Sequence, residues 1–526
     1  MSEGPADFET AIKACRFGRF NIILLVVALP AVIAPTLETA VVSYILPSAE
    51  CDLHLDLLDK GILNAVTYCG MILSAIGWGY LADNRGRRNL LIIGYLLDVI
   101  CVACCAMSQS RVQLMIAKFF GGFIMSGPFA ILVAYLSEFH DSNFRSRIMM
   151  MIGVMFTFAA IILPVLAILI LPQNWNFNLL KMNFVAWKIY LAICGIPSLL
   201  CGTCFCFLPE SPRFLISQGR NAEALEVLKK IYAINTGNPQ DTYPIKELIQ
   251  EIKQKEVAEK KLSIATIETN RKNDEGKLEN NGDEVKDGTL LDKQPNIFKA
   301  LCSKQYLGLC FQVCFIEFLI MLGQNTLRLW LPQLFASLHE YEQMSNESTS
   351  MCTVLEYSVN RTELLKNTPR DECVVVITPS SYTNNIIVAC VGIVTYLLAG
   401  TLINALGNKR IQVIGLIIAG TSGIALYWSS SSLTTIILTS LYSALASMAS
   451  TSCIGSSVIL FPTSLRTMIV SLTMMIGRVG SILGNVMLPI FMSIGCVPPL
   501  VMFTMVMYLG CILAALLPSS NKVELK

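Results

Sequence analysis

The sequence predicts an all-α membrane protein with twelve transmembrane helices. Of the 526 residues, 54% are hydrophobic and only 14% are charged, and the mean hydropathy is +0.59. Soluble domains of this length do not normally combine such values. Apolar runs of about 20 residues recur along the chain, and a helix of that length crosses a hydrocarbon core of roughly 30 Å.

Twelve apolar runs are long enough to cross a bilayer. They cover residues 21–46, 61–82, 89–107, 112–137, 147–171, 187–208, 305–330, 383–406, 411–428, 433–458, 465–492 and 497–517. Basic residues gather in the connections on the side of the N-terminus: Arg85, Arg87, Arg88, Arg145, Arg147, Lys409, Arg410 and Arg466. Basic loops stay in the cytoplasm and the helix count is even, so both termini are predicted to be cytoplasmic. The basic N-terminal segment has no cleavage site, and no cleaved signal is expected.

A polar linker divides the chain into two halves of six helices each. The predicted parts are a cytoplasmic N-terminus (1–20), an N-terminal half (21–208), a linker (209–304), a C-terminal half (305–517) and a cytoplasmic C-terminus (518–526). Apolar residues recur at helical spacing from Asn221 to Ile234, which predicts an amphipathic helix. Residues 257–294 show no apolar period and are predicted to be disordered.

One long connection, residues 331–382, is predicted to be extracytoplasmic. It carries two N-glycosylation patterns, which begin at Asn346 and Asn360. Cys352 and Cys373 share this loop and an oxidising compartment, so a disulfide between them is expected, with Cys51 in the first outer loop as a competing partner. Most other cysteines fall in apolar runs, where a thiol packs as a small apolar side chain.

A cluster of glycine and charge separates the second and third helices, Gly79-Tyr-Leu-Ala-Asp-Asn-Arg-Gly-Arg-Arg88. Gly79 and Gly86 permit close packing and a sharp turn, and the arginines hold the turn on the cytoplasmic side. The cluster resembles the signature loop between helices 2 and 3 of the major facilitator superfamily of transporters.

Two further segments are similar to motifs of that superfamily. Pro209-Glu-Ser-Pro-Arg-Phe-Leu215 follows helix 6, as in the sugar-porter and organic-ion branches, and Glu138 with Arg145 and Arg147 resembles the charged pair that engages the helix 2–3 turn. The resemblance implies a cytoplasmic gating latch. Its residues are Gly79, Asp83, Gly86, Arg87, Arg88, Glu138 and Arg147.

The second half repeats these motifs with two losses. Asn404 stands where the turn between helices 8 and 9 would carry an acid, and Ile459 stands where the acid is expected before Phe461-Pro-Thr463. The second latch is therefore expected to be weaker. These losses favour an alternative to transport, a membrane binding protein that keeps the fold.

Within the superfamily, three segments look most like the branch around synaptic vesicle glycoprotein 2 and related organic-ion transporters. They are Cys51-Asp-Leu53, Trp78-Gly-Tyr-Leu-Ala-Asp83 and Leu327-Arg-Leu-Trp-Leu-Pro332. Hexose porters carry a Gln-Gln pair in helix 7, where this chain has Gly323-Gln-Asn-Thr326. A hexose substrate is therefore disfavoured.

Glu38, Asp98, Glu317 and Arg478 lie well inside predicted helices. Each costs about 2.5–3.5 kcal/mol at a helix centre, so each is expected to face a cavity or a partner. Helices 1 and 7 line the central cavity of the fold that the resemblance implies, which makes Glu38, Glu317 and Arg478 candidates for substrate binding or proton coupling. Two alternatives stay open: one of the acids pairs with Arg478, and Asp98 makes a structural hydrogen bond to neighbouring backbone.

The resemblance implies a monomeric secondary active or facilitative transporter of a small organic ion, in a plasma or vesicle membrane, with a proton as candidate coupling ion. The net charge of +2 gives no reason to expect nucleic-acid binding. Three scattered histidines provide neither a catalytic nucleophile–base pair nor a metal site, so neither an enzyme nor a cofactor is expected.

Overall fold

The computed structural model describes residues 5–173, 175–179, 182–249, 304–345, 350–367 and 379–518. The segment predicted to be disordered, residues 257–294, lies outside these ranges, as do Asn346 and Cys373. The side chains of Asp83 and Asn404 are likewise outside the described part.

Twelve spans within these ranges are long and apolar enough to cross a membrane, which confirms the predicted fold class. Those of the first half are α2 (Arg19–Leu53), α3 (Leu57–Arg85), α4 (Arg87–Ala106), α5 (Arg111–Met125) continued by α6 (Pro128–Glu138), α7 (Ser142–Ile170), and α8 (Ala186–Cys194) continued by α9 (Ile196–Phe205). Those of the second half are α14 (Lys304–Ser345), α16 (Ser380–Leu406), α17 (Asn408–Ala425), α18 (Ser432–Leu460), α19 (Thr463–Ile494) and α20 (Val497–Ala515).

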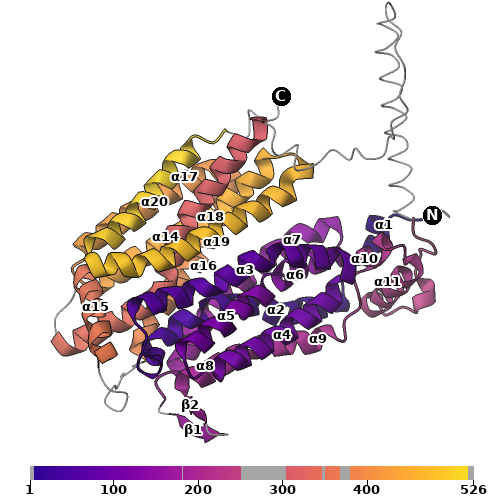
Figure 1. Cartoon of the computed structure of the whole chain (residues 1–526). Helices are drawn as coiled ribbons and strands as arrows, with labels where there is room; N and C mark the ends of the chain where they lie inside the picture. The colour runs from indigo at the N-terminus through magenta and orange to yellow at the C-terminus, as the bar shows by residue number, and fades with distance from the viewer. Residues whose placement is uncertain are drawn as a thin grey trace, which may run out of the picture.

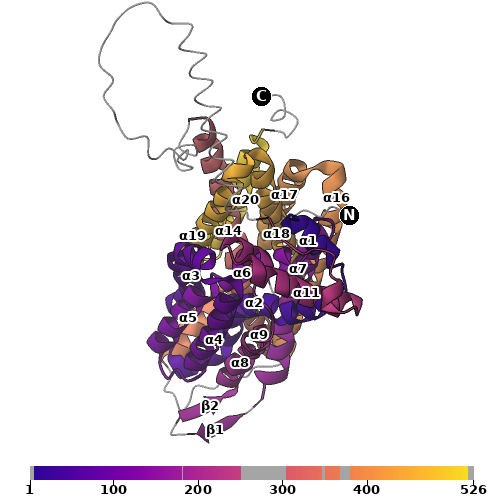
Figure 2. The same cartoon turned by 90° about the vertical axis from the view of Figure 1, so that its right-hand side faces the viewer.

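Each half forms its own hydrophobic core. The halves meet chiefly where α3 packs on α19, α7 on α16 and α2 on α14, and α15 also contacts α2. Figure 1 shows the indigo and purple first half beside the orange and yellow second half, with both chain ends toward one end of the bundle. We call that end the terminal face, and the opposite end, with the hairpin β1–β2 in Figures 1 and 2, the far face.

Two of the spans are broken near their middle. Pro128 is the first residue of α6 and Pro197 the second of α9, and the N-cap of each of these helices is a glycine, Gly127 or Gly195. Proline has no N–H for the helical ladder and clashes with the preceding turn, so the helix restarts at these points. The first break lies next to Ser126, which contacts the second half.

A small helical layer covers the first half at the terminal face. It consists of α1 (Phe8–Ala14), α10 (Pro212–Ser217), α11 (Asn221–Thr236) and η1 (Gln240–Thr242). The helix predicted over Asn221–Ile234 is α11, and it buries Leu228 and Ile231. Asn235 ties it to the start of α2, because its side chain accepts from the N–H of Phe20 at 2.9 Å and donates to Asn21 Oδ1 at 3.0 Å.

At the far face the structure differs from the sequence prediction in three ways. The hairpin β1 (Asn176–Leu179) and β2 (Met182–Val185) is antiparallel, with Asn176 opposite Val185. The helix α14 ends at Ser345 instead of 330, because Leu331, Leu334 and Leu338 continue the buried face at helical spacing beyond Pro332. The connection after it contains a further helix, α15 (Met351–Asn367).

The disulfide of Cys352 corrects the predicted pairing with Cys373. Cys352 is bonded to Cys496, with the two Cα atoms 5.1 Å apart. Cys496 lies in the turn between α19 and α20, and α15 packs against α19 there, which brings the cysteines within bonding distance. Cys51 is also disulfide-bonded. The Cys352–Cys496 disulfide fixes α15 to the turn between α19 and α20, which belong to the second half.

Cys496→Ser should lower the midpoint of thermal unfolding, because the bond closes a loop across a sequence separation of 144 residues. A cross-link of that span contributes about 2–4 kcal/mol. Differential scanning fluorimetry of the purified protein measures the effect, and Cys390→Ser is a matched control because Cys390 is an exposed free thiol. Equal melting of both variants would contradict the assignment.

Candidate functional site

A group of polar residues bridges the two halves near mid-span, and we call it the central site: Tyr68, Ser126, Asn325, Arg328 and Arg478. Arg478 of α19 donates to Ser126 Oγ at 3.4 Å, at the break between α5 and α6. Tyr68 of α3 donates to Asn325 Oδ1 at 3.3 Å, and Arg328 donates to the same oxygen at 2.9 Å. Each residue lies well inside its span.

The central site carries two positive charges. Neither Arg328 nor Arg478 has a carboxylate within ion-pair distance among the side chains that the structure describes, and each hydrogen-bonds a neutral group. A cationic side chain inside the membrane is costly unless it is compensated. An anionic group bound between the halves would compensate both guanidiniums.

Glu38 is paired inside the first half, and its partner is not Arg478. Lys118 of α5 donates to Glu38 Oε1 at 2.6 Å and to the backbone oxygen of Glu38 at 2.9 Å. Both side chains are almost completely buried. Gly121, one turn further along α5, leaves room for the carboxylate, since a Cβ there would overlap Oε1. The sequence prediction missed Lys118, although a lysine inside the fourth apolar run was visible.

Asp98 of α4 lies beside this ion pair and is also buried. Ser198 of α9 donates to Asp98 Oδ2 at 2.6 Å. The expected structural hydrogen bond to backbone is therefore a bond from a side-chain hydroxyl instead. One small cavity is lined by Glu38, Asp98 and Lys118 together.

Glu317 occupies the related place in the second half. Both Glu38 and Glu317 lie on the first span of a half and contact the fourth span, α5 or α18. Ser450 of α18 donates to Glu317 Oε1 at 2.6 Å, whereas Oε2 has no hydrogen-bond partner within the described residues. The fourth span thus hydrogen-bonds the carboxylate through Lys118 in the first half and through Ser450 in the second half. Glu317 thus has no compensating cation among the described side chains.

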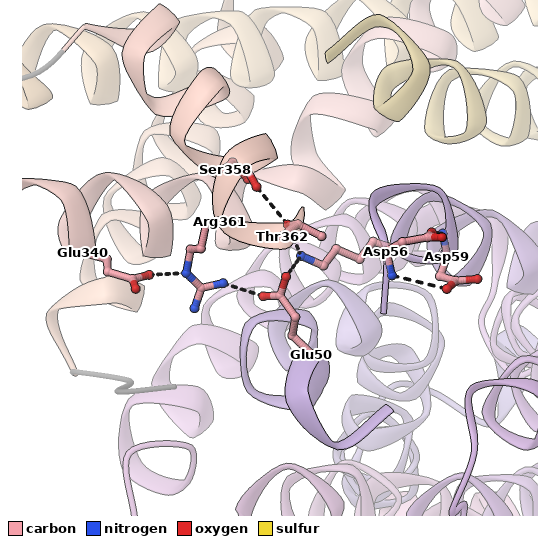
Figure 3. Close-up of polar contacts among 8 residues, drawn as sticks. Glu50, Asp56, Asp59, Glu340, Ser358, Arg361 and Thr362 are labelled. Carbon is pink, nitrogen blue, oxygen red and sulfur yellow. Dashed lines mark hydrogen bonds and ion pairs between the residues drawn. The ribbon is translucent and has the colours of Figure 1, made fainter. Parts of the chain in front are cut away.

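A buried ionic network joins the halves at the far face (Figure 3). Glu50 of α2 accepts from Lys60 of α3 at 2.6 Å and from Arg361 of α15 at 2.5 Å. Arg361 Nε lies 2.5 Å from Glu340 of α14, and Lys60 also donates to Thr362 at 3.1 Å. We call these five residues, Glu50, Lys60, Glu340, Arg361 and Thr362, the far-face network.

Three members of the far-face network are buried, whereas the side chain of Glu340 is 37% exposed. The side chains of Lys60, Glu50 and Arg361 are 0%, 1% and 8% exposed. Burial opposes the charge of Arg361, but the carboxylates of Glu50 and Glu340 outweigh it and raise the pKa of this guanidinium. Nearby, Tyr382 of α16 donates to the backbone oxygen of Tyr44 across the halves at 3.0 Å. The far face is therefore closed in this conformation.

The predicted latch residues lie at the terminal face of the first half, and they are only partly brought together. Arg87 Nε is 3.5 Å from Glu138 Oε1, whereas the guanidinium of Arg147 lies over the ring of Phe144 at 5.6 Å. Gly86 turns the chain with φ +87°, as the motif predicted. Arg88 donates to the backbone oxygen of Phe205 at 3.1 Å.

Glu210 is a latch residue that the prediction did not name. Its Oε1 accepts from the backbone N–H groups of Arg87 and Arg88 at 3.0 and 3.1 Å, and so caps the start of α4. The signal was present, because Glu210 lies inside the Pro209–Leu215 motif. The motif and the helix 2–3 turn are thus two parts of one structure.

Comparison with known proteins agrees with this arrangement of helices. The family described as "Sugar (and other) transporter" matches residues 32–273. The chain resembles the "Inward open conformation of the xylose transporter XylE from E. coli", with a TM-score of 0.64 at 16% identity, covering 96% of this chain and 98% of that one. XylE is a major facilitator superfamily protein. The chain has the major facilitator fold.

Sequence relatives support the predicted branch. "Synaptic vesicle glycoprotein 2B" of Rattus norvegicus is 30% identical over 247 residues, which are 46% of this chain and 36% of the relative. "Synaptic vesicle glycoprotein 2A" of Rattus norvegicus is 29% identical over 244 residues, 45% of this chain and 33% of the relative. The matches span about a third of these relatives. The predicted resemblance is confirmed, and the chain is a multi-pass membrane protein of the major facilitator fold.

Proposed function

We propose that this protein is a secondary transporter that moves a small organic anion by alternating access around the central site. The observation that carries the proposal is the pair Arg328 and Arg478, which sit between the halves without carboxylate partners in the described part of the chain. Guanidinium groups bind carboxylates and phosphates in bidentate geometry. Tyr68 and Asn325 would add polar contacts that orient the substrate.

The far-face network is the gate that this cycle must open. The substrate reaches the central site from the terminal face while the network holds the far face closed. Access from the far face requires Arg361 and Thr362 to leave Glu50 and Lys60. Because the Cys352–Cys496 disulfide fixes α15 to the second half, α15 moves with that half when the gate opens. The contacts that break are those of Arg361 and Thr362 with Glu50 and Lys60.

We assign the far face to the extracytoplasmic side, in a plasma or vesicle membrane, and the protein to a monomeric state. Two observations support the orientation: the far face holds the Cys352–Cys496 disulfide, and Asn360 is exposed on α15. Disulfides persist in oxidising compartments, and glycans attach on the same side. The predicted acceptor Asn346 lies outside the described residues.

A second candidate function is a membrane binding protein that does not transport. The exposed Ile459, where the superfamily motif carries an acid, favours it. The sequence relatives of this protein include vesicle glycoproteins, and that name fits either function. Transport measurements separate the two.

The test is uptake into proteoliposomes of labelled organic anions, cations and sugars, with and without a pH gradient. We expect anions to accumulate, and Arg478→Gln to reduce their uptake at least tenfold because a charge-assisted contact contributes about 1.5–3 kcal/mol. Arg111→Gln is the matched control, since Arg111 forms a half-exposed pair with Asp59 that contributes little. If no member of the panel accumulates, the binding-protein function replaces transport. If cations accumulate instead, the anion assignment is wrong.

A further inference from the structure

A small polar cavity lies inside the first half, and none of the central-site residues lines it. Its polar lining is Glu38 of α2, Asp98 of α4 and Lys118 of α5. The rest of its lining is apolar or thiol: Ala34, Leu37, Val41, Val102, Cys105, Leu191 and Cys194. The cavity volume is about 10 Å³, near the minimum that one water molecule requires. We call it the N-half cavity.

The charges around the N-half cavity do not balance when every group is ionised. Two carboxylates face one ammonium group. The ammonium of Lys118 donates to the side-chain oxygen Oε1 and to the backbone oxygen of Glu38. Asp98 is 1% exposed, and its Oδ2 accepts only from the neutral Ser198. Its Oδ1 has no hydrogen-bond partner among the described residues. One negative charge is therefore left over.

The other titratable groups that face Asp98 do not supply the missing positive charge. They are thiols and a phenol, which are neutral when protonated: Tyr95, Cys101, Cys105, Cys194 and Cys201. A hard metal cation would take six or more oxygen ligands, whereas the cavity offers two carboxylates. A proton needs one oxygen.

The energies favour a neutral Asp98. An uncompensated carboxylate in the protein interior is more costly than a neutral carboxylic acid with one unmade hydrogen bond. We propose that the N-half cavity is a proton-binding site, in which Asp98 holds the proton while Lys118 neutralises Glu38. The site is separate from Glu317, so each half contains a buried carboxyl group that has no cationic partner among the described side chains.

This inference rests on the proposed function only for the use of the proton. In a transporter, two protonatable sites would allow two protons to move with each substrate. The presence of the proton is a property of the resting protein and can be measured without any substrate. Failure of the transport assay therefore leaves this test intact.

The experiment is infrared difference spectroscopy of the purified full-length protein in lipid, which resolves the carbonyl stretch of protonated carboxylic acids. Asp98→Asn should remove one such band at neutral pH. Glu317→Gln is the matched control, and it should remove a different band, so that the double variant loses both. Ser198→Ala should shift the frequency of the Asp98 band, because it removes the hydroxyl that donates to Oδ2.

The charge count predicts two further spectra. Glu38→Gln should also remove the band, because Asp98 then ionises as the partner of Lys118. Lys118→Met should add a band, because the carboxyl groups of Glu38 and Asp98 are then both neutral. If this variant folds poorly, the double variant Lys118→Met, Glu38→Gln should show the single band of Asp98. A spectrum of Asp98→Asn identical to that of the native protein overturns the proposal.

Discussion

Glu50→Gln is expected to open the far face. Glu50 is the only acceptor in the described chain that bonds both Lys60 and Arg361, and its loss leaves two buried cations facing each other. Removing one partner of a buried ion pair costs about 3–5 kcal/mol. The closed conformation should therefore lose roughly a hundred- to a few thousand-fold in population relative to the open one.

Thiol labelling measures this opening. Tyr382→Cys, in a background where the exposed Cys104, Cys206 and Cys390 are replaced, places a probe at a buried contact between the halves. A membrane-impermeant reagent added from the far side should label this probe much faster with Glu50→Gln than without it. Arg111→Gln at the same face is the control. Unchanged labelling would show that the network does not hold the gate.

Removing all three charges should restore closure. In Glu50→Gln, Lys60→Met, Arg361→Met no buried charge is left unpaired, and Glu340 remains 37% exposed to water. Buried ion networks can be replaced by apolar residues of similar size with little loss. Slow labelling of this triple variant would show that unpaired buried cations, and not general damage to the far face, open the Glu50→Gln variant.

The twelve spans could be predicted from the sequence because the bilayer itself imposes them. Any segment that crosses it must be apolar for about 20 residues and must bond its own backbone, whatever it packs against. The breaks at Pro128 and Pro197 leave the apolar pattern unchanged, so each pair of short helices was predicted as one span. The helix α15 was predicted as loop because its residues are polar on average, although Val354 and Leu355 are buried.

The rare intramembrane charges were also visible in sequence, but their partners were not. Glu38 and Lys118 are 80 residues apart, and Glu50 and Arg361 are 311 apart, so only the packing of helices brings them together. Lys60 lies one residue outside the predicted second helix. In the structure it is buried and donates to Thr362 of α15. The disulfide to Cys496 was missed for the same reason, because α15 supplies the contact.

The last prediction concerns Glu317 as the coupling carboxylate. Glu38 is already neutralised by Lys118, whereas Glu317 accepts from the hydroxyl of Ser450 and has no cationic partner among the described side chains. A buried carboxyl group without a cation is more stable in the protonated form, so Glu317 is a candidate to gain and lose a proton as the cavity changes sides. Glu317→Gln mimics the protonated form, so it should keep exchange of substrate at equal pH on both sides and lose accumulation driven by a pH gradient.

Proteoliposomes loaded with unlabelled substrate measure exchange, and empty ones with an imposed gradient measure accumulation. Ser450→Ala is the matched control, since it removes the hydrogen bond but keeps the carboxyl group and should retain both activities. If exchange and accumulation fall together in Glu317→Gln, the side chain acts in substrate binding or folding instead of coupling. If gradient-driven accumulation persists in Glu317→Gln and is lost in Asp98→Asn, the coupling proton is carried in the N-half cavity alone, because the two variants remove one protonatable group from each half.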